Sequence, residues 1–149
     1  MRIEQFCAHS PNVPTAGFGG TLLTYNILTN GRDGNGKGEW SGFRPGCFDE
    51  FLQAKPFNIP VLMSHEADRV VGWITEIVSY DNVLRVFGKI FDVRVFDERE
   101  LSLSIGARCY DMNGGFATRA SIIEVSIVSE GADKTAKVTS SQPGIFKLN

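Results

Sequence analysis

The chain has 149 residues, 42% of them hydrophobic and 21% charged, with a formal net charge of −2. A chain of this length can bury a single core without the help of disulfides. The nearly balanced charge gives no reason to expect electrostatic binding to nucleic acid or to an anionic membrane, so we expect a protein partner. No segment approaches the roughly 20 apolar residues of a membrane span. Residues 1–10 lack the apolar run of a signal peptide, and we therefore expect an intracellular protein.

Strand patterns dominate the chain from its first apolar segment onward. Phe18–Thr29 is rich in β-branched and aromatic residues and predicts a strand. The glycine-rich Gly31–Glu39 predicts a flexible loop, and because it has neither GxGxxG nor Walker spacing, we expect no nucleotide there. The apolar residues of Phe48–Leu52 recur at helical spacing, which predicts a short helix that ends before Pro56.

The second half of the chain predicts five further strands. Turn and loop signals separate them, and Tyr80–Asn82 and Asn113–Gly115 are typical of β-hairpins. The charged segment Asp92–Glu100 fits either a helical turn or a loop. The five strands are Ile59–His65, Val70–Val78, Val83–Phe91, Leu101–Tyr110 and Phe116–Val128.

These elements predict a mainly β protein. About six to seven short strands with few helices are typical of a closed or nearly closed antiparallel β-barrel carrying one or two short helices. We expect one domain over residues 1–138 and a loose polar tail over residues 139–149. Five aromatic side chains are expected to pack in the core or to line a cleft: Phe18, Trp40, Phe43, Phe48 and Trp73.

The three cysteines, Cys7, Cys47 and Cys109, lie far apart in the sequence and form no CxxC motif or Cys/His cluster. This spacing predicts neither a disulfide framework nor a zinc site. Free thiols fit a reducing cytosol. We expect no metal and no other cofactor.

Only two histidines, His9 and His65, are available for a histidine-based mechanism. His9 lies in a polar N-terminal segment that we expect to be mobile. His65 ends an apolar strand and precedes polar residues, so its imidazole can face a cleft while the strand fixes its backbone. A half-buried histidine satisfied by a carbonyl group is the alternative that this position leaves open.

A serine-rich strand supplies a candidate nucleophile. Alternation along Leu101–Cys109 places Ser102, Ser104 and Gly106 on one face, which stays shallow enough for a substrate backbone to approach. A serine hydroxyl becomes a good nucleophile when a nearby base, commonly histidine, removes its proton. The alternative is that both serines are merely solvated strand residues.

A carboxylate in the last long strand could complete the group. Alternation there places Ile123, Val125 and Ile127 on one face, and Glu124 and Ser126 on the other. An acidic residue in such an apolar strand needs a partner, and a catalytic histidine would be one. A solvent-facing glutamate on an exposed sheet face is the alternative. Hydrolysis by paired carboxylates is disfavoured, because no second buried acidic partner is evident.

Five segments resemble, in order and spacing, the prohead maturation proteases of tailed phages. The family pattern is a PG-x-F helix start, H-[DE] after an apolar strand, hG-x-I (h apolar), an LSIG serine strand and an E-V-S-h-V strand. The resemblance covers roughly residues 20–137. Each motif alone is weak, whereas five in the same order are fairly specific. The segments are RPGCFDEFL from Arg44, VLMSHEADRVVGWITEI from Val61, LRVFGKIF from Leu84, LSLSIGA from Leu101 and IIEVSIV from Ile122.

The resemblance implies a fold similar to herpesvirus assemblin, a β-barrel serine protease surrounded by helices. It also implies that Ser104 is the nucleophile and His65 the catalytic histidine. Glu124 is our choice for the third member, although assemblin-type enzymes have a histidine in that role and no histidine follows His65 here. The candidates for the oxyanion site or the substrate cleft are Ser102, Ile105, Gly106 and Arg108.

The activity implied by the resemblance is a serine endopeptidase that cleaves scaffold and capsid-protein segments inside the assembling prohead, in the host cytoplasm, with self-cleavage afterwards. Self-association of the chain stays open. Three features depart from the family pattern: Ala107 replaces an aromatic residue, the stretch after the last strand lacks proline-alanine-asparagine, and the segment from Phe91 to Leu101 is short. None of them removes a proposed catalytic residue.

Two other readings compete with the protease. A non-catalytic capsid or scaffold component that kept the protease fold would have Ser104 and His65 far apart, or its cleft filled by its own tail. A β-barrel binding module would need a basic face rich in aromatic residues. The observation that separates these readings is whether the Ser104 and His65 side chains lie within about 4 Å of each other.

Overall fold

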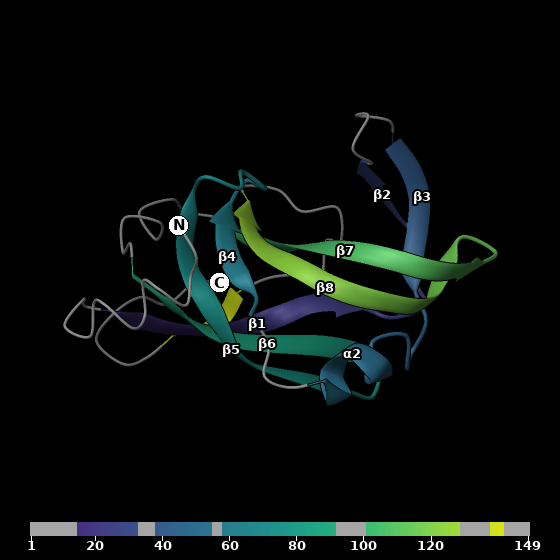
Figure 1. Cartoon of the computed structure of the whole chain (residues 1–149), viewed down its shortest axis with the longest axis horizontal. Coiled ribbons are helices and arrows are strands. Elements are labelled where there is room, and N and C mark those ends of the chain that lie inside the picture. Colours follow the sequence, from purple (N-terminus) through teal and green to yellow (C-terminus); the bar gives the residue numbers. More distant parts are fainter. Residues whose placement is uncertain (1–14, 33–37, 55–57, 92–100, 129–137, 142–149) are drawn as a thin grey trace.

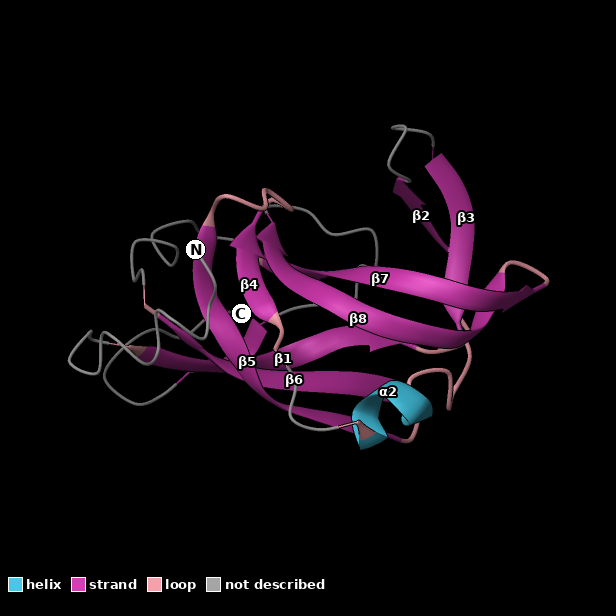
Figure 2. Ribbon diagram, viewed as in Figure 1, coloured by secondary structure: helices cyan, strands magenta, loops and turns pink. Residues whose placement is uncertain are grey.

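The computed structural model describes residues 15–32, 38–54, 58–91, 101–128 and 138–141 (Figure 1). Strands make up most of this part of the chain, with one short helix at the lower edge of the view (Figure 2). The elements are β1 (Ala16–Thr24), β2 (Thr29–Arg32), β3 (Gly38–Phe43), α2 (Asp49–Gln53), β4 (Pro60–Met63), β5 (Val70–Tyr80), β6 (Val83–Ile90), β7 (Ser102–Asn113), β8 (Phe116–Val128) and β9 (Val138–Ser141).

The strands form one sheet that curls into an open half-barrel, so the predicted closed or nearly closed barrel is wrong. The order of paired strands is β2-β3-β8-β4-β5-β6-β1-β9, with β7 paired to β8. Within the described residues no pair joins the two ends of this order. A barrel closes only when its end strands meet with matching tilt and register. Here the β2/β3 hairpin rises at the upper right of the view, whereas β9, the yellow strand, lies left of the centre (Figure 1).

β8 organises the sheet and shows that the prediction of a wholly antiparallel sheet is also wrong. β7 pairs antiparallel with β8 along its whole length. β3 pairs in parallel with the start of β8, and β4 pairs in parallel with its end. Alternation within one strand reports which side faces the core, but not which neighbour pairs with it or in which direction. The mixed pairing was therefore outside the reach of the sequence pattern.

The predicted hairpins and the short helix are confirmed. Gly114 and Gly115 have φ values of +62° and +84° in the turn between β7 and β8, which is the conformation that a two-residue hairpin requires. Asp81 has φ +49° in the turn between β5 and β6. The helix covers Asp49–Gln53, close to the predicted bounds.

The glycine-rich segment is only partly the loop that we predicted. Gly31 and Arg32 belong to β2, and Gly38 and Glu39 belong to β3; the two strands pair antiparallel. Residues 33–37 between them lie outside the described part of the chain, as do His9, Cys7 and the charged segment 92–100.

The C-terminal segment starts as a strand. β9 pairs antiparallel with β1, so Thr139–Ser141, which we assigned to a loose tail, extend the sheet. Residues 142–149 of the predicted tail lie outside the described residues.

A single apolar core lies inside the half-barrel. Phe48 is fully buried and Phe18 nearly so, as predicted for core aromatics. The Phe43 ring packs against the Phe48 ring with 5.2 Å between centroids, and Trp73 stacks on Phe91 at 6.1 Å. The side chain of Trp40 lies outside the described set. The largest fully buried side chains are Tyr25, Phe48, Leu22, Leu84, Ile90, Leu103, Ile127, Val61, Val86, Val125 and Cys47.

Candidate active site

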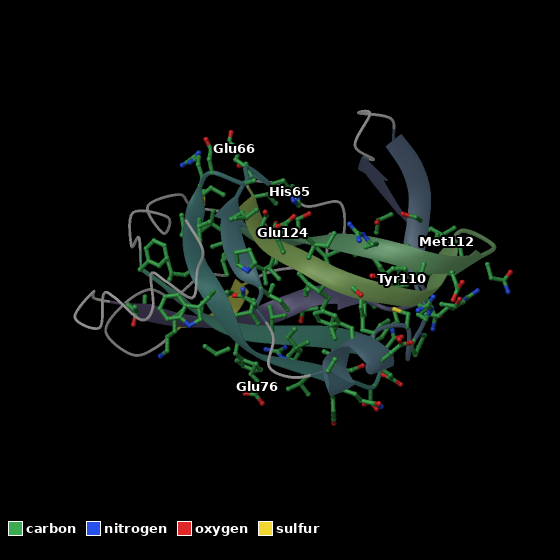
Figure 3. The ribbon with its side chains drawn as sticks, viewed as in Figure 1. His65, Glu66, Glu76, Tyr110, Met112 and Glu124 are labelled. Atoms are coloured by element: carbon green, nitrogen blue, oxygen red, sulfur yellow. The ribbon has the colours of Figure 1, made fainter. Side chains whose placement is uncertain are left out.

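Strand register brings three distant segments to one place. In β8, Ser126 lies opposite Leu62 of β4 on one side and opposite Ser104 of β7 on the other. Glu124 lies opposite Gly106 of β7. His65 follows β4 by two residues, and so it emerges where β4 and β8 end together (Figure 3). The sheet therefore fixes the backbone of all three proposed catalytic residues.

The three side chains form a continuous hydrogen-bonded chain. His65 Nε2 lies 2.8 Å from Ser104 Oγ, and His65 Nδ1 lies 2.6 Å from Glu124 Oε1. Because an ionised carboxylate can only accept, Nδ1 carries the proton in the neutral ring and Nε2 accepts from the serine hydroxyl. The predicted proximity of Ser104 and His65 is confirmed. In the sequence, His65 is 39 positions from Ser104 and 59 positions from Glu124.

His65 sits in an uncommon backbone conformation. Ser64 and His65 have φ values of +53° and +61°, and the Glu66 amide donates to the Met63 carbonyl at 3.0 Å. Two consecutive positive φ values closed by such a bond define a type I′ turn, which glycine and asparagine favour. Each left-handed non-glycine residue costs roughly 1–3 kcal/mol, so neighbouring contacts must hold the turn.

Two contacts from β8 anchor this turn. The Ser64 amide donates to the Ile127 carbonyl at 3.0 Å. The His65 amide donates to Ser126 Oγ, also at 3.0 Å. The turn therefore extends the β4–β8 pairing beyond the end of β4 and directs the imidazole back toward the sheet.

The Glu124 carboxylate is held from three sides. Its Oε1 accepts from His65, and its Oε2 accepts from the Ser126 hydroxyl at 2.6 Å. On the third side, a β carbon at position 106 would overlap Oε1, Cδ and Cγ of Glu124, so Gly106 leaves the space that the carboxylate occupies. The Glu124 side chain is 12% exposed and that of His65 is 45% exposed. The acid is thus shielded while the base stays open to a substrate.

Glu124 also sets the protonation of His65. The hydrogen bond from the imidazole to the Glu124 carboxylate raises the pKa of His65 above its ordinary value of 6.5, and the negative charge adds to this effect. Partial burial of the ring acts in the opposite direction and lowers the pKa. The net increase means that the pair favours an imidazolium, which is the species that forms when His65 accepts a proton.

A β-bulge at Ile123 allows the strand to serve both the core and the site. Gly106 pairs with Glu124 but the next residue, Ala107, pairs with Ile122, so Ile123 has no partner in β7. Ile122 is buried and Ile123 is 50% exposed. Our prediction that Ile123 shares the buried face of Val125 is therefore wrong, because the bulge shifts the alternation by one residue. Without it, Ile122 would share the face of Glu124.

The remaining predicted cleft residues do not join the hydrogen-bonded chain. Ser102 is partly exposed opposite Val128, and Arg108 is exposed opposite Ser121. The Ile105 side chain packs against the core. Within the described residues no hydrogen bond links Ser102 or Arg108 to the three side chains, and their oxyanion and cleft roles stay predictions.

Two features of the site were missed from the sequence. The predicted alternation had placed Ser126 beside Glu124 without assigning it a role. The signal was there, because a serine two positions after a carboxylate in a strand shares its face. The left-handed turn at Ser64 and His65 carries no such signal, since neither residue is a glycine or an asparagine.

The described part of the chain has two cysteines outside the candidate site. Cys47 and Cys109 are both free thiols, and burial raises the pKa of Cys47 to about 12. No group of three or more histidine, cysteine, aspartate or glutamate side chains in the described ranges could hold a metal ion. Likewise, no described helix has the length and apolar character needed to cross a membrane.

Comparisons with known proteins place the fold. No protein-family model matches the chain, and no curated protein sequence matches it significantly. The varicella-zoster virus protease superposes with a TM-score of 0.60 at 12% identity, over 87% of this chain and 65% of the viral protease. The Kaposi's sarcoma-associated herpesvirus protease in complex with a hexapeptide phosphonate inhibitor gives the same values.

A second structure of the Kaposi's sarcoma-associated herpesvirus protease, with an allosteric inhibitor, superposes with a TM-score of 0.52 at 11% identity, over 89% of this chain and 79% of the protease. The chain thus spans about two thirds of the length of the first two proteases that it matches. At these identities the likeness concerns the fold. The chain therefore has a fold similar to that of the herpesvirus proteases, which confirms the expected assemblin-like architecture.

Proposed function

We propose that this protein is a serine endopeptidase in which Ser104 is the nucleophile, His65 the general base and Glu124 the residue that orients the base. The observation that carries the proposal is the chain of hydrogen bonds from Ser104 Oγ to His65 and on to Glu124, at 2.8 and 2.6 Å. A nucleophile bonded to a base, with a third group orienting the base, is the arrangement that activates a serine hydroxyl.

The geometry supports the following steps. Ser104 Oγ attacks the carbonyl carbon of a peptide bond while its proton moves to His65 Nε2. The imidazolium is stabilised by the carboxylate of Glu124, and it then gives the proton to the leaving amine as the C–N bond breaks. His65 next takes a proton from water, whose oxygen attacks the acyl-enzyme ester. The second product leaves as a carboxylic acid, and Ser104 regains its proton.

The oxyanion of each tetrahedral intermediate needs hydrogen-bond donors, each worth about 3 kcal/mol of transition-state stabilisation. We propose backbone N–H groups near Ser104 or Arg108 for this role, with Ile105 and Gly106 as neighbours in the same strand. The imidazole is half-exposed and Ser104 is partly exposed, which supports access of a peptide to both.

For the substrate, we propose segments of capsid and scaffold proteins that are cleaved while a phage prohead matures in the host cytoplasm, followed by self-cleavage. Support comes from the five sequence segments that resemble phage prohead proteases and from a fold similar to that of viral proteases. One of the two arrangements expected of the non-catalytic alternative, with Ser104 and His65 far apart, does not fit the hydrogen-bond contact between them.

Covalent labelling tests the proposal without knowledge of the cleavage sequence. A peptidyl phosphonate diester is attacked at phosphorus by an activated serine, which displaces an alcohol or phenol and leaves a phosphonyl-serine. One of the similar herpesvirus proteases binds a hexapeptide phosphonate inhibitor. We expect one adduct, located on Ser104 by peptide mapping, and no adduct in Ser104→Ala or His65→Ala.

The matched control is Ser121→Ala, which removes a hydroxyl from β8 outside the site, where it bonds only Tyr110 among the described contacts. This variant should label like the wild type. An adduct on another residue, or undiminished labelling of folded His65→Ala, would contradict the assigned roles.

A further inference from the structure

Ser126 occupies the centre of the site although no catalytic step uses it. It is fully buried, and it lies opposite Leu62 of β4 and opposite Ser104 of β7. Its neighbours in β8 are the buried apolar residues Val125 and Ile127. A hydroxyl costs free energy in such surroundings unless it is hydrogen-bonded. The position of this hydroxyl therefore calls for a specific explanation.

The direction of both hydrogen bonds to Ser126 follows from the chemistry of its partners. The His65 backbone N–H can only donate, so Ser126 Oγ accepts at that contact of 3.0 Å. A serine hydroxyl has one proton, which is then left for Glu124 Oε2 at 2.6 Å. The other oxygen of this carboxylate accepts from the His65 imidazole. Both carboxylate oxygens are thus used.

These bonds close a ring that begins and ends at His65. The ring runs from the His65 amide to the Ser126 hydroxyl, then to the Glu124 carboxylate, and back to His65 Nδ1. Its first bond stabilises the backbone of the left-handed turn, and its last bond sets the orientation of the imidazole. One buried hydroxyl therefore links the conformation of the turn to the position of the acid.

We propose that Ser126 is a positioning residue that locks the His65–Glu124 pair by closing this hydrogen-bonded ring. It touches neither substrate nor reacting atoms, because it is fully buried. Ser126 affects catalysis by setting the orientation of the imidazole, and therefore the geometry of the hydrogen bond between His65 Nε2 and Ser104 Oγ. The inference deepens the proposed function and rests on it for the kinetic measurement only.

The test measures His65 directly in the 149-residue chain. A short hydrogen bond from an imidazole to a carboxylate gives a strongly deshielded Nδ1 proton, and with only two histidines in the chain a His9→Gln background assigns the signal. In Ser126→Ala we expect this resonance to disappear or to broaden, and the amide proton of His65 to exchange with solvent faster. The catalytic constant should fall roughly tenfold to a hundredfold, since small misplacements of a catalytic group cost that much, while KM stays unchanged.

A second variant covers the case in which Ser126→Ala folds poorly. Ser126→Cys keeps the shape of the side chain but replaces a good donor by a weak one, and it should show the same spectroscopic changes. Ser121→Ala, which removes a hydroxyl from the same strand outside the ring, is the control and should leave both the resonance and the rates unchanged.

Two outcomes separate this inference from the proposed function. If folded Ser126→Ala and Ser126→Cys keep the deshielded resonance, the slow amide exchange and the wild-type catalytic constant, Ser126 has no positioning role. If both variants lose the resonance but the wild-type protein neither cleaves peptides nor reacts with a phosphonate, the ring stands and the peptidase proposal fails.

Discussion

Gly106→Ala tests whether the packing of the Glu124 carboxylate matters for the chemistry. A β carbon at position 106 would lie 2.7 Å from Glu124 Cδ, whereas ordinary contact begins at 3.4 Å. The carboxylate must therefore move by roughly 0.7 Å or more, away from two hydrogen bonds of 2.6 Å each. A displacement of about 1 Å in a catalytic group costs up to a hundredfold in rate. We expect the catalytic constant to fall by roughly tenfold to a hundredfold.

The same substitution should also change the titration of His65. Because the bond to Glu124 is the main cause of the raised pKa of His65, moving the carboxylate lowers this pKa toward its ordinary value. The assay combines NMR titration of the imidazole with turnover of a fluorogenic peptide. The control is Gly88→Ala, where a β carbon would overlap the Trp73 carbonyl and the Phe18 ring, away from the site. It should destabilise the fold without altering the pKa of His65.

The outcome that would refute this reasoning is a folded Gly106→Ala protein with the wild-type catalytic constant and the wild-type pKa of His65. Such a result would mean that Glu124 can reposition without consequence. The carboxylate would then have no orienting role.

Three further predictions concern the same group of residues. Glu124→Gln should lower the pKa of His65 and reduce the catalytic constant by roughly 10²–10⁴-fold. The acid limb of the pH profile of kcat/KM, which we place above pH 6.5 in the wild type, should move to lower pH. An acid limb that stays in place would argue against His65 as the base. Ser64→Gly should raise the free energy of unfolding in urea by roughly 1 kcal/mol. Relief of the left-handed strain contributes about 1–3 kcal/mol, which exceeds the roughly 0.4–1 kcal/mol by which glycine stabilises the unfolded chain through its entropy. A loss of stability would show that the turn is unstrained. Because the folded-state pKa of His65 is raised, its positive charge stabilises the fold fully below pH 6.5, and this stabilisation is lost as the pH rises through the folded-state pKa. The free energy of unfolding of the wild type should therefore exceed that of His65→Gln by more at about pH 5.5 than at about pH 8.5. The reverse order would contradict the raised pKa.

Local patterns in the sequence were sufficient to place the long strands and the faces of their side chains. Alternation in β7 put Ser104 and Gly106 together on the face opposite Leu103, which is fully buried in the structure. Gly114 and Gly115 marked a hairpin because only residues tolerant of positive φ fit such a turn. These predictions depend only on residues that are adjacent or nearly adjacent in the chain, and the sequence itself gives that information.

The features that the sequence did not show depend on distant neighbours. β3 and β4 share one edge of β8 because β8 is long enough to pair with both, and no local pattern reports that pairing. The open edge of the half-barrel likewise depends on where β2 and β9 end in space. Short strands such as β2, which contains a glycine and no alternation of apolar residues, resemble loops when read alone.

In the candidate site, too, the features that depend on local sequence were predicted, and those that depend on distant strands were not. Candidate residues were found by chemistry, since a chain with two histidines offers few possible bases. The bulge at Ile123 and the left-handed turn at His65 were not, because each is imposed by pairing with another strand. The turn directs the His65 imidazole back toward the sheet, and the bulge lets Ile122 face the core although Glu124 faces the site.

Cleavage of a natural substrate by the wild-type protein and by Ser104→Ala tests the nucleophile most directly. Capsid and scaffold proteins, which are the substrates that we propose, would be co-expressed with either form, and the products would be identified by intact mass. We predict discrete cleavage products with the wild type and none with Ser104→Ala, while both proteins unfold at similar temperatures. The same products from a purified Ser104→Ala protein would contradict the claim that this hydroxyl, activated by His65, carries out the reaction.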